Sequence, residues 1–531
     1  MDDKLREEIN RRRTFAIISH PDAGKTTLTE KFLLFGGAIN TAGSVKGKAN
    51  SKYAVSDWMD IEKERGISVT SSVLQFNYDG YCINILDTPG HQDFSEDTYR
   101  TLMAADSAVM VIDASKGVEA QTIKLFKVCV MRHIPIFTFI NKMDRDARDT
   151  FELLDDIETV LGIKTCPVNW PIGSGKEFKG VYDRKTKIVS TFQAISTGGA
   201  KKAEETDYHI DDEALKELVG PYLFDQFNEE IELIDGATEE MDIEKVRAGE
   251  LSPVFFGSAL NTFGIEQFLN YFLKMTTPPI GRNSSEGIID PVTEPFSAFV
   301  FKIQANMNKA HRDRIAFMRI CSGKFEAGME VYHAASKRKI KLSQPQQLMA
   351  QDRKIVDEAY AGDVIGVFDP DLFSIGDTLT TGGKKFEYEG IPTFAPEHFC
   401  RVVQLNSMKR KQFVKGVTQI AQEGAIQIFQ EYTAGLSEII VGVVGVLQFD
   451  VLKYRLENEY GWEIRLEPIP YNYIRWVKDP TIDVTKLKRV SDVKKVKDMK
   501  GNPLLLFANE WVIDQVLQHN EGLELEEFRK N

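Results

Sequence analysis

The sequence predicts a multidomain α/β protein: a doubly wound, mostly parallel sheet, then a small β-barrel, then a C-terminal α+β domain. A short apolar strand at 15–18 runs into a Gly-Lys-Thr loop and a helix, as in P-loop sheets. Short strands with glycine turns and no useful helix occupy 294–381. From Phe399 strands and helices mix again, which fits a ferredoxin-like fold. We expect domains over residues 1–280, 290–385 and 395–531, with an insertion at about 165–250.

Composition indicates a globular protein that does not coat nucleic acid through bulk charge. The chain has 531 residues, 42% hydrophobic and 27% charged, which is enough for several large cores. The formal net charge of −13 argues against a DNA-binding protein, although local basic patches could still meet a nucleic acid. No run approaches the roughly 18 apolar residues of a membrane span.

The cysteines and the N-terminus predict a cytoplasmic location. The five cysteines are scattered, odd in number and form no Cys-x-x-Cys pair, so neither a disulfide framework nor a zinc site is expected. Residues 1–13 are charged throughout and lack the apolar run of a signal peptide.

The loop after the first strand has the residues of a phosphate-binding loop. Backbone N–H groups at the helix N-terminus would surround the β-phosphate, and Lys25 would neutralise β- and γ-oxygens. The Thr26 hydroxyl would ligate Mg²⁺. Ser19 stands where the strict pattern has its first glycine. The loop residues expected to bind nucleotide are Ser19, His20, Pro21, Asp22, Ala23, Gly24, Lys25, Thr26 and Thr27.

A second phosphate-facing turn is predicted where the strand at 81–86 ends. Asp87 at the tip of a buried strand is costly unless it is paired, and a Mg²⁺-bound water is a natural partner. Gly90 lets the backbone approach a γ-phosphate closely. The loop at 57–72 could supply a hydroxyl to Mg²⁺, although composition alone favours an ordinary surface loop. The expected nucleotide contacts of the turn are Asp87, Thr88, Pro89 and Gly90.

The tetrapeptide after the strand at 134–140 predicts guanine specificity. The Asp144 carboxylate can accept hydrogen bonds from N1–H and the exocyclic amine of guanine, while Lys142 lies over the ring. Adenine would leave that carboxylate unpaired, so discrimination by about 10⁴ is within reach. After the final strand at 254–257, a backbone N–H can bind the guanine carbonyl. The base-contacting residues are Asn141, Lys142, Asp144, Ser258, Ala259 and Leu260, and the expected ligands are GTP and GDP.

The remaining elements follow from periodicity. We expect a strand at 107–113, helices at 119–132 and 265–275, and an acidic, sparsely helical insertion at 201–250. Gly173-Ser174-Gly175-Lys176 lacks P-loop spacing and is interpreted as a turn. Later elements are strands at 399–405, 438–444 and 462–466, helices at 417–429 and 445–460, and short helical pieces near 510–518.

Five signatures in one order resemble the translational GTPases of the elongation factor G/Tu group, so the first domain is identified as a P-loop GTPase domain. They are the P-loop, Glu64-Arg65-Gly66-Ile67, Asp87-Thr88-Pro89-Gly90-His91, Asn141-Lys142-Met143-Asp144 and Ser258-Ala259-Leu260. The segment 375–379 resembles the β-barrel of these factors, and 443–449 resembles the start of a helix in the third domain of elongation factor G. The chain length and the form of the phosphate loop most resemble those of the GTP-binding release factors of bacteria. A translocase would have further domains, and an elongation factor Tu would have a second barrel.

The resemblance implies a monomeric factor that binds the ribosome after termination and, using GTP, promotes dissociation of class I peptide release factors. His91 takes the position of the catalytic residue that orients the attacking water, with Pro21 and Ile67 as a hydrophobic gate. Without the resemblance, a surface turn histidine would be favoured. Ser68 stands where relatives carry the Mg²⁺-binding threonine, although Thr70 competes for that role. The implied metal ligands are Thr26, Ser68 and Asp87.

Several alternatives remain open at this point. The guanine tetrapeptide opposes a P-loop ATPase or kinase, and His91 opposes, less strongly, a GTP-gated binding protein that never hydrolyses. Another ribosome-acting translational GTPase, translocase-like or a rescue or protection factor, is the nearest competitor. The basic run 486–500 could contact ribosomal RNA or could equally be a solvated charged face.

Overall fold

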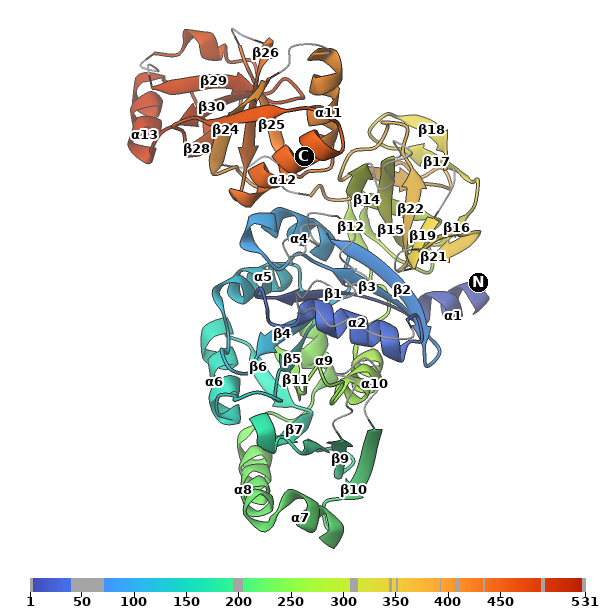
Figure 1. Cartoon of the computed structure of the whole chain (residues 1–531). Coiled ribbons are helices and arrows are strands. Elements are labelled where there is room, and N and C mark those ends of the chain that lie inside the picture. Colours follow the sequence, from blue (N-terminus) through green and yellow to red (C-terminus); the bar gives the residue numbers. More distant parts are fainter. Residues whose placement is uncertain are drawn as a thin grey trace.

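The chain folds into an N-terminal nucleotidase sheet with an insertion, a β-barrel and a C-terminal sheet, which follow one another in sequence (Figure 1). In Figure 1 the C-terminal sheet lies at the top and the insertion at the bottom, on the far side of the N-terminal sheet. The computed structural model describes residues 3–39, 71–193, 204–305, 314–342, 346–349, 352–391, 393–405, 410–432, 435–488 and 492–527. No helix in those residues is both long enough and apolar enough to span a membrane.

The N-terminal sheet has seven strands in the order β2-β3-β1-β4-β5-β11-β6. All neighbours are parallel except β2, which pairs antiparallel with β3. The strands are β1 (Arg12–Ser19), β2 (Ser72–Tyr78), β3 (Tyr81–Asp87), β4 (Ser107–Asp113), β5 (Ile136–Asn141), β6 (Lys164–Pro167) and β11 (Leu251–Phe256). The helices are α1 (Asp3–Asn10), α2 (Lys25–Phe35), α4 (Ser95–Leu102), α5 (Ala120–Met131), α6 (Thr150–Leu161) and α10 (Ile265–Met275).

Both faces of this sheet are covered, which confirms the doubly wound prediction. Alternate residues of β1 point to opposite faces: Phe15 packs in one core cluster with α2 and α10, and Ala16 in the other with α4, α5 and α6. Because each central strand is buried on both faces, its sequence is a continuous apolar run rather than an alternating one.

The insertion contains more helix than its composition predicts. It has a four-stranded antiparallel sheet in the order β10-β9-β8-β7. The prediction of sparse helix at 201–250 is wrong, because Phe227, Ile231 and Ile234 form a buried stripe within a 17-residue helix whose acidic residues face outward. The predicted turn at 173–176 is confirmed. The elements are β7 (Asn169–Ile172), β8 (Gly180–Asp183), β9 (Ile188–Gln193), β10 (Glu204–His209), α7 (Glu213–Val219), α8 (Pro221–Ala237) and α9 (Ile243–Ala248).

The barrel is an eight-stranded sheet in the order β18-β17-β23-β14-β15-β22-β19-β20, with β16 and β21 paired beside it. Ile9 of α1 is buried in the core of this barrel, so the charged N-terminus is a structural part of it. The strands are β14 (Ser297–Ala305), β15 (Arg314–Ser322), β16 (Lys324–Glu326), β17 (Glu330–His333), β18 (Arg338–Lys341), β19 (Gln346–Met349), β20 (Asp352–Ile355), β21 (Glu358–Tyr360), β22 (Val364–Phe368) and β23 (Thr378–Thr380), preceded by the hairpin β12 (Arg282–Ser284) and β13 (Gly287–Ile289).

The C-terminal part has the expected α+β character. Its first six elements run β-α-β-β-α-β, with the strand order β27-β24-β26-β25, and the sheet continues through β29-β30-β28-β31. The elements are β24 (His398–Gln404), α11 (Arg410–Gln422), β25 (Gln427–Glu431), β26 (Gly435–Val443), α12 (Leu447–Asn458), β27 (Ile464–Pro468), β28 (Tyr473–Val477), β29 (Val493–Lys497), β30 (Pro503–Phe507), α13 (Glu510–His519) and β31 (Leu525–Glu526).

One predicted helix of this part is wrong. The helix expected at 417–429 is α11, which ends at Gln422, and residues 427–431 form β25 instead. Gly424, with φ of +80°, separates the two elements, because its left-handed conformation ends a helix at little cost. Beyond that glycine, Ile428 and Phe429 are buried in a strand. The basic run 486–500, for which no strand was predicted, contains β29.

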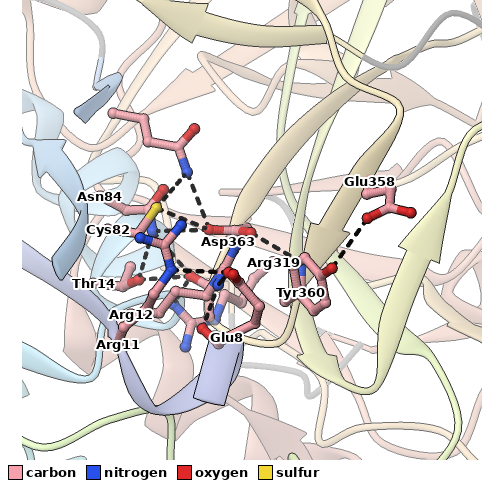
Figure 2. A network of polar contacts seen from close by, with 12 residues as sticks. Glu8, Arg11, Arg12, Thr14, Cys82, Asn84, Arg319, Glu358, Tyr360 and Asp363 are labelled. Carbon is pink, nitrogen blue, oxygen red and sulfur yellow. Dashed lines mark hydrogen bonds and ion pairs between the residues drawn. The ribbon is translucent and has the colours of Figure 1, made fainter. Parts of the chain in front are cut away.

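A buried polar network joins the N-terminal sheet to the barrel (Figure 2). Asp363, on the turn before β22, accepts from Arg12 Nε at 2.7 Å and from Gln75 Nε2 at 3.0 Å. The carbonyl of Gly362 accepts from the Thr14 hydroxyl at 2.6 Å. Gly362 has φ of +104°, and a Cβ there would lie 2.6 Å from Pro279. The turn is therefore seated tightly against the edge of the N-terminal sheet.

Candidate nucleotide-binding site

The carboxyl ends of five parallel strands bring the predicted motifs to one edge of the sheet. Register places Ile17 of β1 beside Asp87 of β3, and Asp113 of β4 beside Asn141 of β5. β11 continues the same edge and leads into Ser258. Ligands of open α/β sheets bind at this edge, so the motifs lie where a site is expected.

The phosphate loop turns sharply between β1 and α2. Gly24 precedes α2 with φ of 101°, and Asp22 also has a positive φ, of 65°. A Cβ on Gly24 would lie 2.2 Å from Asn141 Nδ2. Glycine is thus required at this position by the approach of a side chain from another strand, as well as by its backbone conformation.

Lys25 and Asp87 form a buried ion pair at the centre of the edge. Lys25 Nζ pairs with Asp87 Oδ1, and the two side chains are 6% and 2% exposed. The Thr88 hydroxyl donates to the carbonyl of Ile17 at 2.7 Å and fixes the start of the next turn against β1. The lysine predicted to bind phosphate and the carboxylate predicted to bind a cation are therefore already in contact.

The donor set here suits a hard divalent cation. The Thr26 hydroxyl and the Asp87 carboxylate are oxygen donors of the kind that Mg²⁺ prefers, and Mg²⁺ takes few protein ligands when a nucleotide supplies phosphates. Among the residues that the structure describes, no three His, Cys, Asp or Glu gather as a larger metal site. Ser68, Thr70, Ile67 and Glu64 lie outside the described residues.

Asn141 connects the segment predicted to recognise the base to two other segments. Its Nδ2 donates to the carbonyl of Ala23 at 2.8 Å, and its Oδ1 accepts from the Ala259 N–H at 2.8 Å. Asn141 is buried. Its side chain therefore holds the phosphate loop and the 258–260 loop together, a role that its place in the tetrapeptide does not reveal.

Lys142 lies between the phosphate loop and β4. Its Nζ donates to the carbonyl of Asp22 and lies 2.6 Å from Asp113 Oδ2. Burial by itself raises the pKa of Asp113, but hydrogen bonds from Lys142 and Ser115 outweigh it, and the pKa lies below its usual value. Sequence reasoning missed Asp113, although it stands at the end of a buried strand as Asp87 does.

Asp144 is held by the loop after β11. Ser258 Oγ donates to Asp144 Oδ1 at 2.5 Å, and the Asn261 N–H donates to Ser258 Oγ at 3.3 Å. The hydroxyl thus orients the carboxylate that was predicted to recognise guanine. Ala259 is buried beside it, and Leu260 is partly exposed.

His91 lies in the turn that follows β3. It precedes the single 3₁₀ turn Gln92–Phe94, and its Nδ1 accepts from the Asp93 N–H at 3.2 Å. The imidazole is 32% exposed and lies near Phe94. A Cβ on Gly90 would lie 3.6 Å from Pro21 Cα, so the turn packs directly against the phosphate loop. His20, in that loop, faces Glu119 at 3.4 Å.

Comparison with known proteins identifies the family. A model of the elongation factor Tu GTP binding domain matches residues 10–278, and one of elongation factor G domain 2 matches 295–382. A model of the C-terminal domain of the class II release factor RF3 matches 388–517. The chain is 57% identical to a peptide chain release factor 3 of Symbiobacterium thermophilum, with 98% of each chain covered. The chain belongs to the peptide chain release factor 3 family.

Other relatives agree with this assignment. A peptide chain release factor 3 of Gloeothece citriformis is 52% identical, covering 98% of this chain and 96% of that protein. One of Synechococcus elongatus is 53% identical, covering 98% and 94%. A crystal structure of a protein from Thermus thermophilus has a TM-score of 0.69 at 21% identity, covers 92% of this chain and 72% of that one, and shows a shared fold.

Membership of the peptide chain release factor 3 family confirms the predicted class of activity. The protein is a GTPase that acts in translation termination. An unrelated P-loop ATPase or kinase is excluded, and the C-terminal match favours a release factor over a translocase-like or rescue factor.

Proposed function

We propose that this edge of the sheet binds GTP and GDP together with Mg²⁺, through the residues predicted from the sequence. The main support is the pair of contacts that Asn141 and Lys142 make with the backbone of the phosphate loop, at Ala23 and Asp22. These contacts make the phosphate-binding and base-binding segments one rigid unit. Binding of the phosphates at the phosphate loop is therefore coupled to the geometry of the base-binding segment.

Each residue has a chemical role in this proposal. Lys25 and the N–H groups of the loop bind the β- and γ-phosphates, and Thr26 and Asp87, with Ser68 or Thr70, would hold Mg²⁺. The cation supplies charge neutralisation at the phosphates when it is bound. Thr88, Pro89 and Gly90 place His91 beside the γ-phosphate, and His91 orients the attacking water.

We further propose that the protein is a cytoplasmic monomer that binds the ribosome and uses GTP to dissociate class I peptide release factors. The relatives at 52–57% identity are all named peptide chain release factor 3. We propose the domain limits 1–280, 290–385 and 395–531, with the insertion at about 165–250, as the working units of this factor.

The proposal is tested by measuring GTP hydrolysis with and without ribosomes, and then the dissociation of a labelled class I factor from a termination complex. Hydrolysis that ribosomes do not stimulate, or a class I factor that leaves at the same rate without GTP, would refute it.

Base specificity is tested with Asp144→Asn. The amide would donate where xanthine offers a carbonyl acceptor, so we expect GTP affinity to fall by about 10³ or more and XTP binding to appear. Because Asp144 also accepts from Ser258 at 2.5 Å, Ser258→Ala is the matched control, and it should weaken GTP binding without gaining XTP. Unchanged GTP affinity in Asp144→Asn would refute the guanine assignment.

A further inference from the structure

Asp93, two residues after His91, contacts both that histidine and the C-terminal part of the chain. Its side chain is 7% exposed. Oδ1 lies 3.3 Å from His91 Nδ1, and Oδ2 accepts from the Leu447 N–H at 2.8 Å. A single buried carboxylate thus links the turn of the GTPase site to a residue 354 positions further along the chain.

Two groups of Asp93 face His91 Nδ1: the backbone N–H, which is a donor, and the carboxylate, which is an acceptor. A neutral imidazole accepts the Asp93 N–H at Nδ1 and carries its own proton on Nε2. A protonated imidazole presents Nδ1–H to the carboxylate instead. Both groups of Asp93 lie beside Nδ1, so Nε2 is directed away from Asp93. A carboxylate that orients an imidazole in this way is the third member of many catalytic constellations.

On the other side, Asp93 caps helix α12 from outside its own domain. The first turn of a helix has N–H groups with no partner inside the helix. Gln448 Oε1 accepts from Val444 and Gly445, and Asp93 accepts from Leu447. A negative carboxylate is favoured at this positive end of the helix. α12 contacts the turn at Gln92–Phe94, and in Figure 1 it is seen above α4.

The approach of the two segments is close enough to require a glycine. A Cβ on Gly445 would lie 2.1 Å from Asp93 Cγ and 2.5 Å from Asp93 Cα. Beside it, Phe94 and Val451 form a small apolar cluster with Leu447 and Tyr454 packed against it. The position of Asp93 is thus determined by the C-terminal part of the chain.

We propose that Asp93 is the positioning residue of His91, and that the N-terminus of α12 sets its position, so that docking of the C-terminal part determines the rate of hydrolysis. This rests on the proposed role of His91. Movement of α12 shifts Asp93, and the imidazole then loses its orientation towards the attacking water.

Single-turnover GTP hydrolysis over a range of ribosome concentrations tests the proposal. Asp93→Asn keeps the backbone N–H and an oxygen for Leu447 but loses the charge that faces the imidazole. We expect the rate at saturating ribosomes to fall by about 10- to 100-fold, the effect of one charged hydrogen bond, with an unchanged half-saturating concentration. Gly445→Ala should cause a similar loss, because its Cβ displaces Asp93. Gly236→Ala, where a Cβ would meet nothing within 4 Å, is the matched control and should hydrolyse normally.

Double variants distinguish positioning from simple docking. When Gly445→Ala is added to Asp93→Ala, the rate should fall by less than about twofold below that of Asp93→Ala alone, because Gly445 acts through Asp93. When Asp93→Asn is added to His91→Ala, the rate should likewise fall by less than about twofold below that of His91→Ala alone, because Asp93 acts through His91. Val451→Ala weakens the apolar contact but leaves the bond from the Leu447 N–H to Asp93, so the saturated rate should change only a few-fold. A loss as large as that of Asp93→Asn would show that the apolar contact, and not Asp93, sets the rate.

Two further results would overturn the proposal: an Asp93→Asn rate within twofold of the parent, or losses that multiply in the double variants. A fast His91→Ala would instead refute the catalytic role of His91. The two failures are therefore distinguishable, and GTP affinity measured for every variant confirms that each one is folded.

Discussion

Removing the Asp363 carboxylate should weaken the contact between the barrel and the N-terminal sheet. The Arg12 and Asp363 side chains are 6% and 1% exposed and meet at 2.7 Å. Burial by itself lowers the pKa of Arg12, but the charge of Asp363 and the hydrogen bonds to Glu8 and Asp363 outweigh it, so the pKa is raised and the guanidinium remains charged. In Asp363→Ala that charge stays buried, with Glu8 at 2.8 Å as its remaining carboxylate.

The expected decrease in the free energy of unfolding can be taken from other buried ion pairs that lose one partner. Such a loss costs about 3–5 kcal/mol when an uncompensated charge is left in the interior. The partly exposed Glu8 compensates part of the Arg12 charge, so we expect the lower end of this range. Gln75 and Asn84, which donate to Asp363 Oδ1 at 3.0 and 3.3 Å, also lose one of their hydrogen bonds. For a folding unit the size of the N-terminal sheet with its barrel, we expect the midpoint temperature of the first calorimetric transition to fall by about 5 °C or more.

Scanning calorimetry of Asp363→Ala, Arg12→Ala and the double variant measures this effect. Each transition is fitted separately, since a multidomain chain does not unfold in two states. Glu358→Ala is the control: this exposed carboxylate at the start of β21 pairs with Lys324 and accepts from the Tyr360 hydroxyl but does not contact Arg12 or Asp363, so the first transition should be unchanged. A shift below about 1 °C in Asp363→Ala, or strictly additive effects of the two single substitutions, would refute the reasoning.

Three further predictions concern the site, the basic run and the cysteines. His91→Ala should bind GTP and ribosomes almost normally but lose about 10² or more of ribosome-stimulated hydrolysis, measured under single turnover; a rate within a few-fold of the parent would reduce His91 to a turn residue. Replacing the exposed Lys486, Lys488 and Lys500 by alanine should weaken ribosome binding and lower the slope of log affinity against log salt by about 0.7–0.9 per lost phosphate contact, whereas an unaltered slope would indicate a solvated face. Burial raises the pKa of all five thiols, to about 11 for Cys166 and Cys400 and to about 12 for Cys82 and Cys129. Little thiolate should therefore be present at pH 8, and Ellman's reagent should react rapidly only after unfolding; rapid reaction of the native protein would contradict this.

Local sequence was sufficient for the strands, helices and turns that flank the predicted motifs. The strand and helix on either side of the phosphate loop, and the turns at Asp87 and Asn141, each depend on a few neighbouring residues. The prediction of sparse helix was wrong at α8, because the acidic composition of this segment outweighed the periodic apolar residues of its buried stripe. The helix prediction was wrong again at α11, where a glycine in the left-handed conformation ends the helix before an apolar strand begins.

Only the tertiary structure decided which side chains are partners. Asn141 bonds to Ala23 and Ala259, each 118 positions away, and Arg12 bonds to Asp363, 351 positions away. Asp93 was passed over in the sequence because its second partner, the N–H of Leu447, is a backbone group that no residue type reveals. Hydrophobic periodicity depends on residues a few positions apart, so it determines strands and helices. Contacts between segments hundreds of residues apart depend on how the finished sheets pack, and no local pattern encodes them.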